Sequence, residues 1–177
     1  MKILSRKLVA AVMAGAFALA GAPALAQTAP SDAQIAGIVV AANNVDIDAG
    51  KLAQQRSKNA EVQKFAKLMV TDHTGVNMQA VALVTRLKVT PEDSELSKSL
   101  KQGGSDNLAK LRKLKGAAFD KAYVAHEVVY HQAVIDALDK TLIPNAQNAE
   151  LKDTLVKVRP AFVAHLEHAK HLEASLK

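Results

Sequence analysis

The sequence predicts an all-α protein whose main part is a bundle of four long helices. Ala, Leu, Lys, Gln and Val dominate the composition, and only 3 % of the residues are aromatic. No segment alternates apolar and polar residues as a half-buried strand would. Capping residues and prolines divide the chain into four long segments with helical periodicity. These observations together predict helices packed on helices, with no sheet.

Residues 1–26 have the features of a cleaved signal peptide. A short basic segment precedes an apolar run over residues 8–19, which is too short to span a bilayer comfortably. Small residues at Ala24 and Ala26 then match the pattern that a signal peptidase cleaves. The alternative, an uncleaved membrane anchor, requires a longer apolar run. We therefore expect a periplasmic protein whose mature chain begins at Gln27.

The mature chain is expected to be one mildly basic domain. Three of the 23 Lys and Arg residues lie in the leader and all 17 acidic residues follow it, which leaves a net charge of +3. This charge is too small and too scattered to indicate a nucleic-acid partner. The chain has no Cys, so its stability cannot come from disulfides. The 151 mature residues suffice for one core, and none of their segments is apolar enough to span a membrane.

Capping residues define the first two helices. Ser31 and Gln34 form a capping box that starts a helix running to about Ser57. Asn59 can cap a second helix, which we expect to end near Lys88, shortly before a proline. Residues 27–30 are expected to form a flexible tail, and residues 31–177 the bundle domain.

The second half of the chain predicts a crossover and two more long helices. Residues 92–115 are expected to form two short helices broken at Gly103-Gly104. A third long helix covers residues 117–142 and stops at Ile143-Pro144, and a fourth begins near Asn148. Four long helices with a helical crossover between the second and third are typical of ferritin-like four-helix bundles.

Five polar residues fall on or near apolar helix faces. At 100° per residue, His73 and His165 lie within the apolar stripes of the second and fourth helices. Asp46 lies near the inward face of the first helix, Glu127 within that of the third, and His131 at its margin. Periodicity pairs Asp46 with His73 across the first hairpin, and His131 with His165 across the second. An inward carboxylate needs a charged partner, hydrogen bonds or a metal.

One interpretation of this cluster is a metal site. The candidate ligands are Asp46, His73, Glu127, His131 and His165, with Asp72 and Tyr123 orienting them. Nitrogen and oxygen ligands without sulfur suit zinc, iron, manganese or copper, and the ligand types do not choose among these. If the cluster binds an ion, these atoms should converge to within about 3–5 Å, because metal–ligand bonds are near 2 Å.

The competing interpretation is a neutral hydrogen-bond network without an ion. Asp46, His73, Tyr123 and His165 could satisfy one another and fix the packing of the helices. The Glu-x-x-His pair of di-iron bundles is also missing, because Val70 and Phe162 stand three residues before the two stripe histidines. This absence argues against ferroxidase chemistry and favours a binding protein over an enzyme.

The run from Val62 to His73 (VQKFAKLMVTDH) is the most distinctive motif of the mature chain. Together with Lys51–Ala53, Gly116–Val124, His131, and Pro160 with His165, it resembles the bacterial family labelled domain of unknown function 4142, over residues 33–173. The resemblance implies a ferritin-like bundle and export from the cytoplasm, and many members are labelled as outer membrane proteins. It implies no established activity.

The resemblance also indicates which polar positions recur in the family. These are Asp46, Asp72, His73, Asp120, Tyr123, His131 and His165. The chain departs from the family at Asp46, where members usually have Glu, so the side chain here is one methylene shorter. No segment alternates as the strands of a membrane barrel must, which contradicts a literal reading of the outer-membrane label.

Two hypotheses of different classes follow from the sequence. The first is a small periplasmic binding protein that holds a transition metal within the bundle. The second is a structural or stress-related envelope protein whose polar cluster only fixes helix packing. Either protein could form a homo-oligomer or rest against the outer membrane.

Overall fold

Capping residues place the first two helices where the sequence predicts them. In the computed structural model, which describes residues 29–176, α1 spans Asp32–Arg56 and begins with the predicted capping box at Ser31. Helix α2 spans Ala60–Leu87, and the Asn59 side chain accepts hydrogen bonds from two backbone N–H groups of its first turn. These caps satisfy donors that have no partner within the helix, so the chain reverses direction over only three residues.

The crossover is one continuous helix, and the predicted break at Gly103-Gly104 is wrong. Helix α3 spans Glu95–Leu111 and includes both glycines. A Cβ atom at Gly104 would lie 2.7 Å from Cγ2 of Val45 on α1. Gly104 therefore allows α3 to pack closely on α1, which explains a glycine within an intact helix.

The third long helix continues further than predicted, through a π-helical turn. Helix α4 spans Gly116–Ala137 and leads directly into η1, Leu138–Leu142, and then into the short α5, Ile143–Asn145. Pro144 lies in α5 and has no N–H to bond the preceding turn. The chain accommodates this loss by widening its last turn before the proline. The helix therefore continues past the point where Pro144 was predicted to stop it.

The last helix, α6, spans Ala149–Ser175 and begins where predicted, and the Asn148 side chain caps it. The expected signal peptide and residues 27–28 of the expected tail lie outside the described residues. Within residues 29–176, none of the helices combines the length and the hydropathy that crossing a membrane requires.

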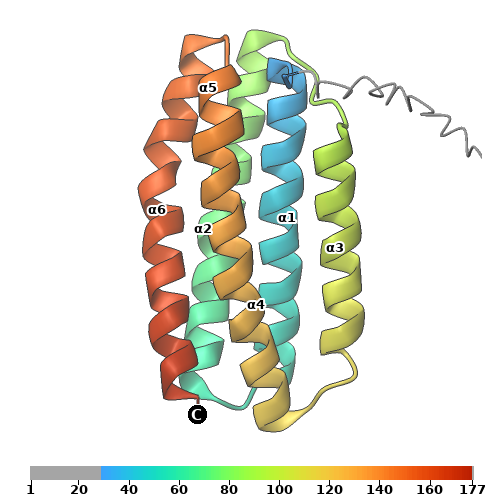
Figure 1. Ribbon diagram of the computed structural model, residues 1–177, viewed down its shortest axis with the longest axis vertical. Helices are drawn as coiled ribbons and strands as arrows, with labels where there is room; N and C mark the ends of the chain where they lie inside the picture. Colours follow the sequence, from blue (N-terminus) through green and yellow to red (C-terminus); the bar gives the residue numbers. More distant parts are fainter. Residues whose placement is uncertain (1–28, 177) are drawn as a thin grey trace, which may run out of the picture.

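The protein is an all-α bundle with five helices of 17 residues or more and no strand among the described residues. Figure 1 shows α1, α2, α4 and α6 running alongside one another, with α3 on the outer side of α1. The buried apolar side chains form two clusters. One contains Ile35, Leu138 and Phe162, and the other contains Phe65, Phe119 and Leu172. Between the two clusters lies a layer of buried polar residues, which includes Asn43, Asp46, His73, Glu127, His131 and His165.

Candidate metal centre

The five candidate ligands lie together in this polar layer. Asp46 comes from α1, His73 from α2, Glu127 and His131 from α4, and His165 from α6. None of these residues is more than 5 % exposed. His131 is fully buried, deeper than the face margin that periodicity predicts, because both α1 and α6 pack against α4.

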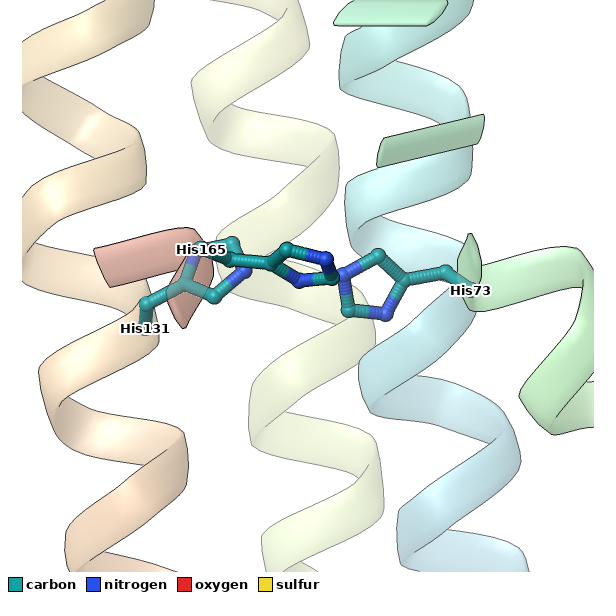
Figure 2. Close-up of side chains that lie close together, drawn as sticks. All are labelled: His73, His131 and His165. Atoms are coloured by element: carbon teal, nitrogen blue, oxygen red, sulfur yellow. The ribbon is translucent and has the colours of Figure 1, made fainter. Parts of the chain in front are cut away.

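Three imidazole rings converge at the centre of the bundle. His73, His131 and His165 each offer one ring nitrogen, and these three nitrogens lie within 4.8 Å of one another. The ring centroids are 5.3–5.5 Å apart, and Figure 2 shows the three rings pointing toward one another from different helices. Two nitrogens bound to one ion lie about 3–4 Å apart, so small side-chain adjustments would bring all three onto a single ion.

The other nitrogen of each ring is held by an oxygen. Nδ1 of His73 lies 2.8 Å from Oδ1 of Asn43, and Nδ1 of His131 lies 3.0 Å from the backbone oxygen of Glu127. Nε2 of His165 lies 2.9 Å from Oδ2 of Asp72. A carbonyl or carboxylate oxygen accepts, so in each pair the ring N–H donates the hydrogen bond.

These outer hydrogen bonds determine what the inner nitrogens can do. A neutral imidazole carries one N–H, so the nitrogen that is not donating carries a lone pair. The nitrogens that do not donate, Nε2 of His73, Nε2 of His131 and Nδ1 of His165, are buried and have no hydrogen-bond partner among the described residues. A buried lone pair is costly unless a cation or a donor satisfies it.

The rings are neutral at physiological pH. Burial, with a smaller contribution from the neighbouring imidazoles, lowers the pKa of His73 to about 2 and that of His131 to about 4. Burial also lowers the pKa of His165, although Asp72 opposes this effect. Neutral imidazole is the form that binds metals, so a metal would not have to displace protons from these rings.

Two carboxylates lie beside the imidazoles. Oδ2 of Asp46 is 3.5 Å from Nε2 of His73, and Oε2 of Glu127 is 3.4 Å from Nδ1 of His131. Asp46, Glu127 and His131 form a second group whose candidate ligand atoms lie within 4.8 Å of one another. All four carboxylate oxygens are buried without a hydrogen-bond partner in the part of the chain that the structure describes.

Burial makes these carboxylates costly to ionise. It raises the pKa of Glu127 to about 8, although the neighbouring Asp46 and Tyr123 side chains lower it in part. Burial also raises the pKa of Asp46 well above its usual range, and the neighbouring Glu127 adds to this rise. Both shifts describe a site without an ion. A divalent cation would favour the ionised form of both groups.

The two residues predicted to orient the ligands lie next to them. Asp72 accepts the hydrogen bond from His165. The Tyr123 hydroxyl is buried without a partner, and burial together with the charges of Glu127 and Asp46 raises its pKa. The predicted pairing of Asp46 with His73 and the proximity of His131 to His165 are both present.

Asp120 and the other three histidines lie outside this cluster. Neither of the two potential metal-binding groups among the described residues includes Asp120, His126, His168 or His171. The side chains of His168 and His171 are exposed on α6. His126 stacks on Tyr130, whose hydroxyl donates a hydrogen bond to the backbone oxygen of Ala42 on α1.

Sequence reasoning missed the asparagines behind His73. Asn43 accepts from the His73 ring, and it donates in turn to Oδ1 of Asn77. Asn43 stands three residues before Asp46, and Asn77 four residues after His73. Both therefore share a helix face with a predicted ligand, and this spacing was a signal that could have found them.

Comparisons with known proteins place the chain in a family. A family model described as "Domain of unknown function (DUF4142)" matches residues 17–172. This range includes all five candidate ligands and the asparagines behind His73. Comparison with curated proteins and with solved structures gave no match.

Proposed function

We propose that this chain, which belongs to the DUF4142 family, is an exported protein that binds one divalent transition-metal ion inside a ferritin-like bundle. The observation that carries the proposal is the set of three buried lone pairs on His73, His131 and His165. Each ring donates its only N–H outward, so none can satisfy the others. A metal ion accepts all three lone pairs at once.

The donor and acceptor balance favours an ion over a neutral network. The layer contains three imidazole lone pairs and two carboxyl groups, and beside them the described residues place the buried, unpartnered hydroxyl of Tyr123, a further donor. Without an ion, Asp46 and Glu127 must keep their protons to supply donors, as the rise in their pKa values indicates. A divalent ion would replace these two protons and balance the two negative charges.

A single ion accounts for both potential metal-binding groups, the three histidines and the group of Asp46, Glu127 and His131. His131 belongs to each of them, and its Nδ1 already donates to a backbone carbonyl. One imidazole nitrogen binds one ion, so the two groups cannot be filled independently. We propose His73, His131 and His165 as ligands, completed by Asp46, Glu127 or both.

The ligand types leave four metals. Imidazole and carboxylate donors without sulfur suit zinc, iron, manganese and copper, and the chain has no cysteine. We propose that the protein meets this metal in the periplasm, free or against the outer membrane, after cleavage behind Ala26. Mass spectrometry of the secreted protein tests this, because the mature chain should begin at Gln27.

The direct test is metal analysis of untagged mature protein. Elemental analysis after incubation with each of the four metals should find close to one equivalent of ion per chain. His73→Ala and His165→Ala should each lose the metal, whereas His171→Ala, which alters an exposed histidine of the same α6, should retain it. Circular dichroism of each variant separates loss of a ligand from loss of the fold.

The competing function is a structural or stress-related envelope protein whose polar layer only fixes helix packing. It requires wild-type protein to remain metal-free after every incubation, and that result would refute the binding proposal. Retention of the metal in both histidine variants would refute the proposed ligands. Size-exclusion chromatography of the same samples tests whether the protein forms a homo-oligomer.

A further inference from the structure

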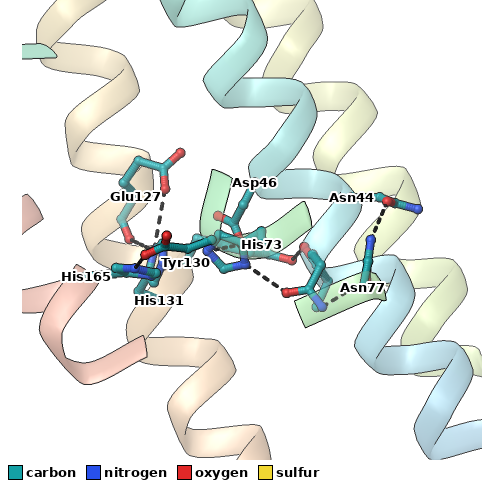
Figure 3. A network of polar contacts seen from close by, with 11 residues as sticks. Asn44, Asp46, His73, Asn77, Glu127, Tyr130, His131 and His165 are labelled. Atoms are coloured by element: carbon teal, nitrogen blue, oxygen red, sulfur yellow. Dashed lines mark hydrogen bonds and ion pairs between the residues drawn. The ribbon is translucent and has the colours of Figure 1, made fainter. Parts of the chain in front are cut away.

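A chain of three side-chain amides leads from the candidate metal centre to the surface. Nδ1 of His73 donates to Oδ1 of Asn43, the Asn43 amide nitrogen donates to Oδ1 of Asn77 at 3.0 Å, and the Asn77 amide nitrogen donates to Oδ1 of Asn44 at 2.9 Å. Figure 3 shows His73, Asn77 and Asn44 of this relay at the seam between α1 and α2. Every amide in it points its oxygen toward His73 or the preceding member.

The relay passes from the core to solvent. Asn43 is 1 % exposed, Asn77 is half-buried and Asn44 is exposed. The two outer amides line an open groove of about 570 Å³ between α1 and α2, together with Thr74. The outer part of the relay can therefore be altered without creating a cavity in the core.

The His73 ring needs such a relay because its acceptor is reversible. His131 donates to a backbone carbonyl and His165 to a carboxylate. A backbone carbonyl and an ionised carboxylate can only accept, so neither can become a donor. Asn43 is different, because turning its amide over would present an NH₂ group to the ring. The proton would then move to Nε2 of His73, the nitrogen that faces the other imidazoles, and it would block the lone pair there.

The Asn77 amide opposes this reversal. Turning over Asn43 alone would set its oxygen against the Asn77 oxygen, so Asn77 and Asn44 would have to turn over with it. We infer that Asn43 and Asn77 are positioning residues that hold His73 in the tautomer able to bind the metal. This inference rests on the proposed function, but the tautomer itself can be measured without any metal.

Zinc affinity of three variants tests the role of Asn77, which contacts no candidate ligand directly. Asn77→Ala removes the acceptor of Asn43 and should weaken zinc binding by up to about 10-fold, the lower end of the effect of losing a residue bonded directly to a ligating histidine, because Asn77 acts only through Asn43. Asn77→Asp keeps an accepting oxygen and should bind zinc nearly as tightly as wild type. Thr74→Ala, in the same groove but outside the relay, should not change the affinity. Competition with a chromophoric zinc chelator measures all of them.

Nitrogen-15 NMR of the imidazole rings supplies a readout that a purely structural role would not move. In metal-free wild type, the His73 proton should reside on Nδ1, and Asn77→Ala should increase the population with the proton on Nε2. An Nε2–H tautomer in wild type would overturn the inference. So would unchanged zinc affinity in Asn77→Ala, or an Asn77→Asp variant as weak as Asn77→Ala. If wild type binds none of zinc, iron, manganese and copper, the proposed function fails, and the NMR result still decides the tautomer.

Discussion

Replacing Glu127 with glutamine tests the electrostatic account of the metal-free site. Burial raises the pKa of Glu127 from an ordinary value of 4.5 to about 8. Between these values the folded protein keeps a proton that the unfolded chain releases, so the free energy of unfolding falls as the pH rises. The fall is about 1.4 kcal/mol per pH unit, which amounts to about 3 kcal/mol between pH 4.5 and 7. The stabilising proton is fully present at low pH and is lost above pH 8.

Glutamine has nearly the same shape and no such proton. Glu127→Gln should therefore unfold at nearly the same urea concentration as wild type at acidic pH, and be more stable than wild type by up to about 3 kcal/mol at pH 7. Urea denaturation of chelator-treated protein, followed by circular dichroism at several pH values, measures the difference. Glu173→Gln, on the exposed surface of α6, is the matched control and should show no such pH-dependent gain.

Metal binding should make wild type more stable than Glu127→Gln, which reverses the order expected for the metal-free proteins at pH 7. Wild type gains about 2.7 kcal/mol at a free ion concentration one hundred times its dissociation constant, whereas the variant lacks one negative oxygen ligand and should gain less. A stability difference between Glu127→Gln and wild type that stays constant from pH 5 to 8 would refute the reasoning. It would mean that Glu127 is already ionised in the metal-free protein.

Three further predictions concern packing and the surroundings of the site. Gly103→Ala should stabilise the protein by about 0.5–1 kcal/mol, because no atom lies within contact distance of the added Cβ. Gly104→Ala should destabilise it by about 1–3 kcal/mol, because the added Cβ would lie 2.7 Å from a valine methyl group on α1. Urea denaturation should therefore give changes in the free energy of unfolding of opposite sign for the two variants. Tyr130→Phe should lose about 1 kcal/mol of stability with its 3.1 Å hydrogen bond to an α1 carbonyl, and equal midpoints would contradict this. Asp72→Asn should weaken zinc binding by about tenfold, because an amide orients His165 less firmly than a carboxylate; chelator competition would show no change if Asp72 has no such role.

The helix boundaries could be predicted because they depend on local chemistry. Ser31, Asn59 and Asn148 each cap the helix that follows with their own side chain, and this interaction involves only residues a few positions apart. The break predicted at Gly103-Gly104 failed for the converse reason. Glycine weakens a helix locally, but close packing against α1 makes a residue without a side chain necessary at the second position.

The candidate site was predictable as a set of residues and not as an arrangement. Periodicity correctly placed His73, Glu127 and His165 in the interior, because the face of a helix follows from residue spacing. It placed His131 at a margin, because burial there depends on which helices pack against α4. It also passed over Asn43, whose role exists only through contacts across the α1–α2 seam.

The sequence by itself determined an all-α chain, the ends of most of its helices and which ionisable groups face inward, because capping and helical period act over a few residues. Only the tertiary structure decided that three of these groups meet within 4.8 Å and which nitrogen each ring directs inward. The physical reason is that a tautomer depends on the acceptor behind the ring. Those acceptors come from a neighbouring helix for two of the rings, and no local pattern in the sequence specifies how neighbouring helices pack.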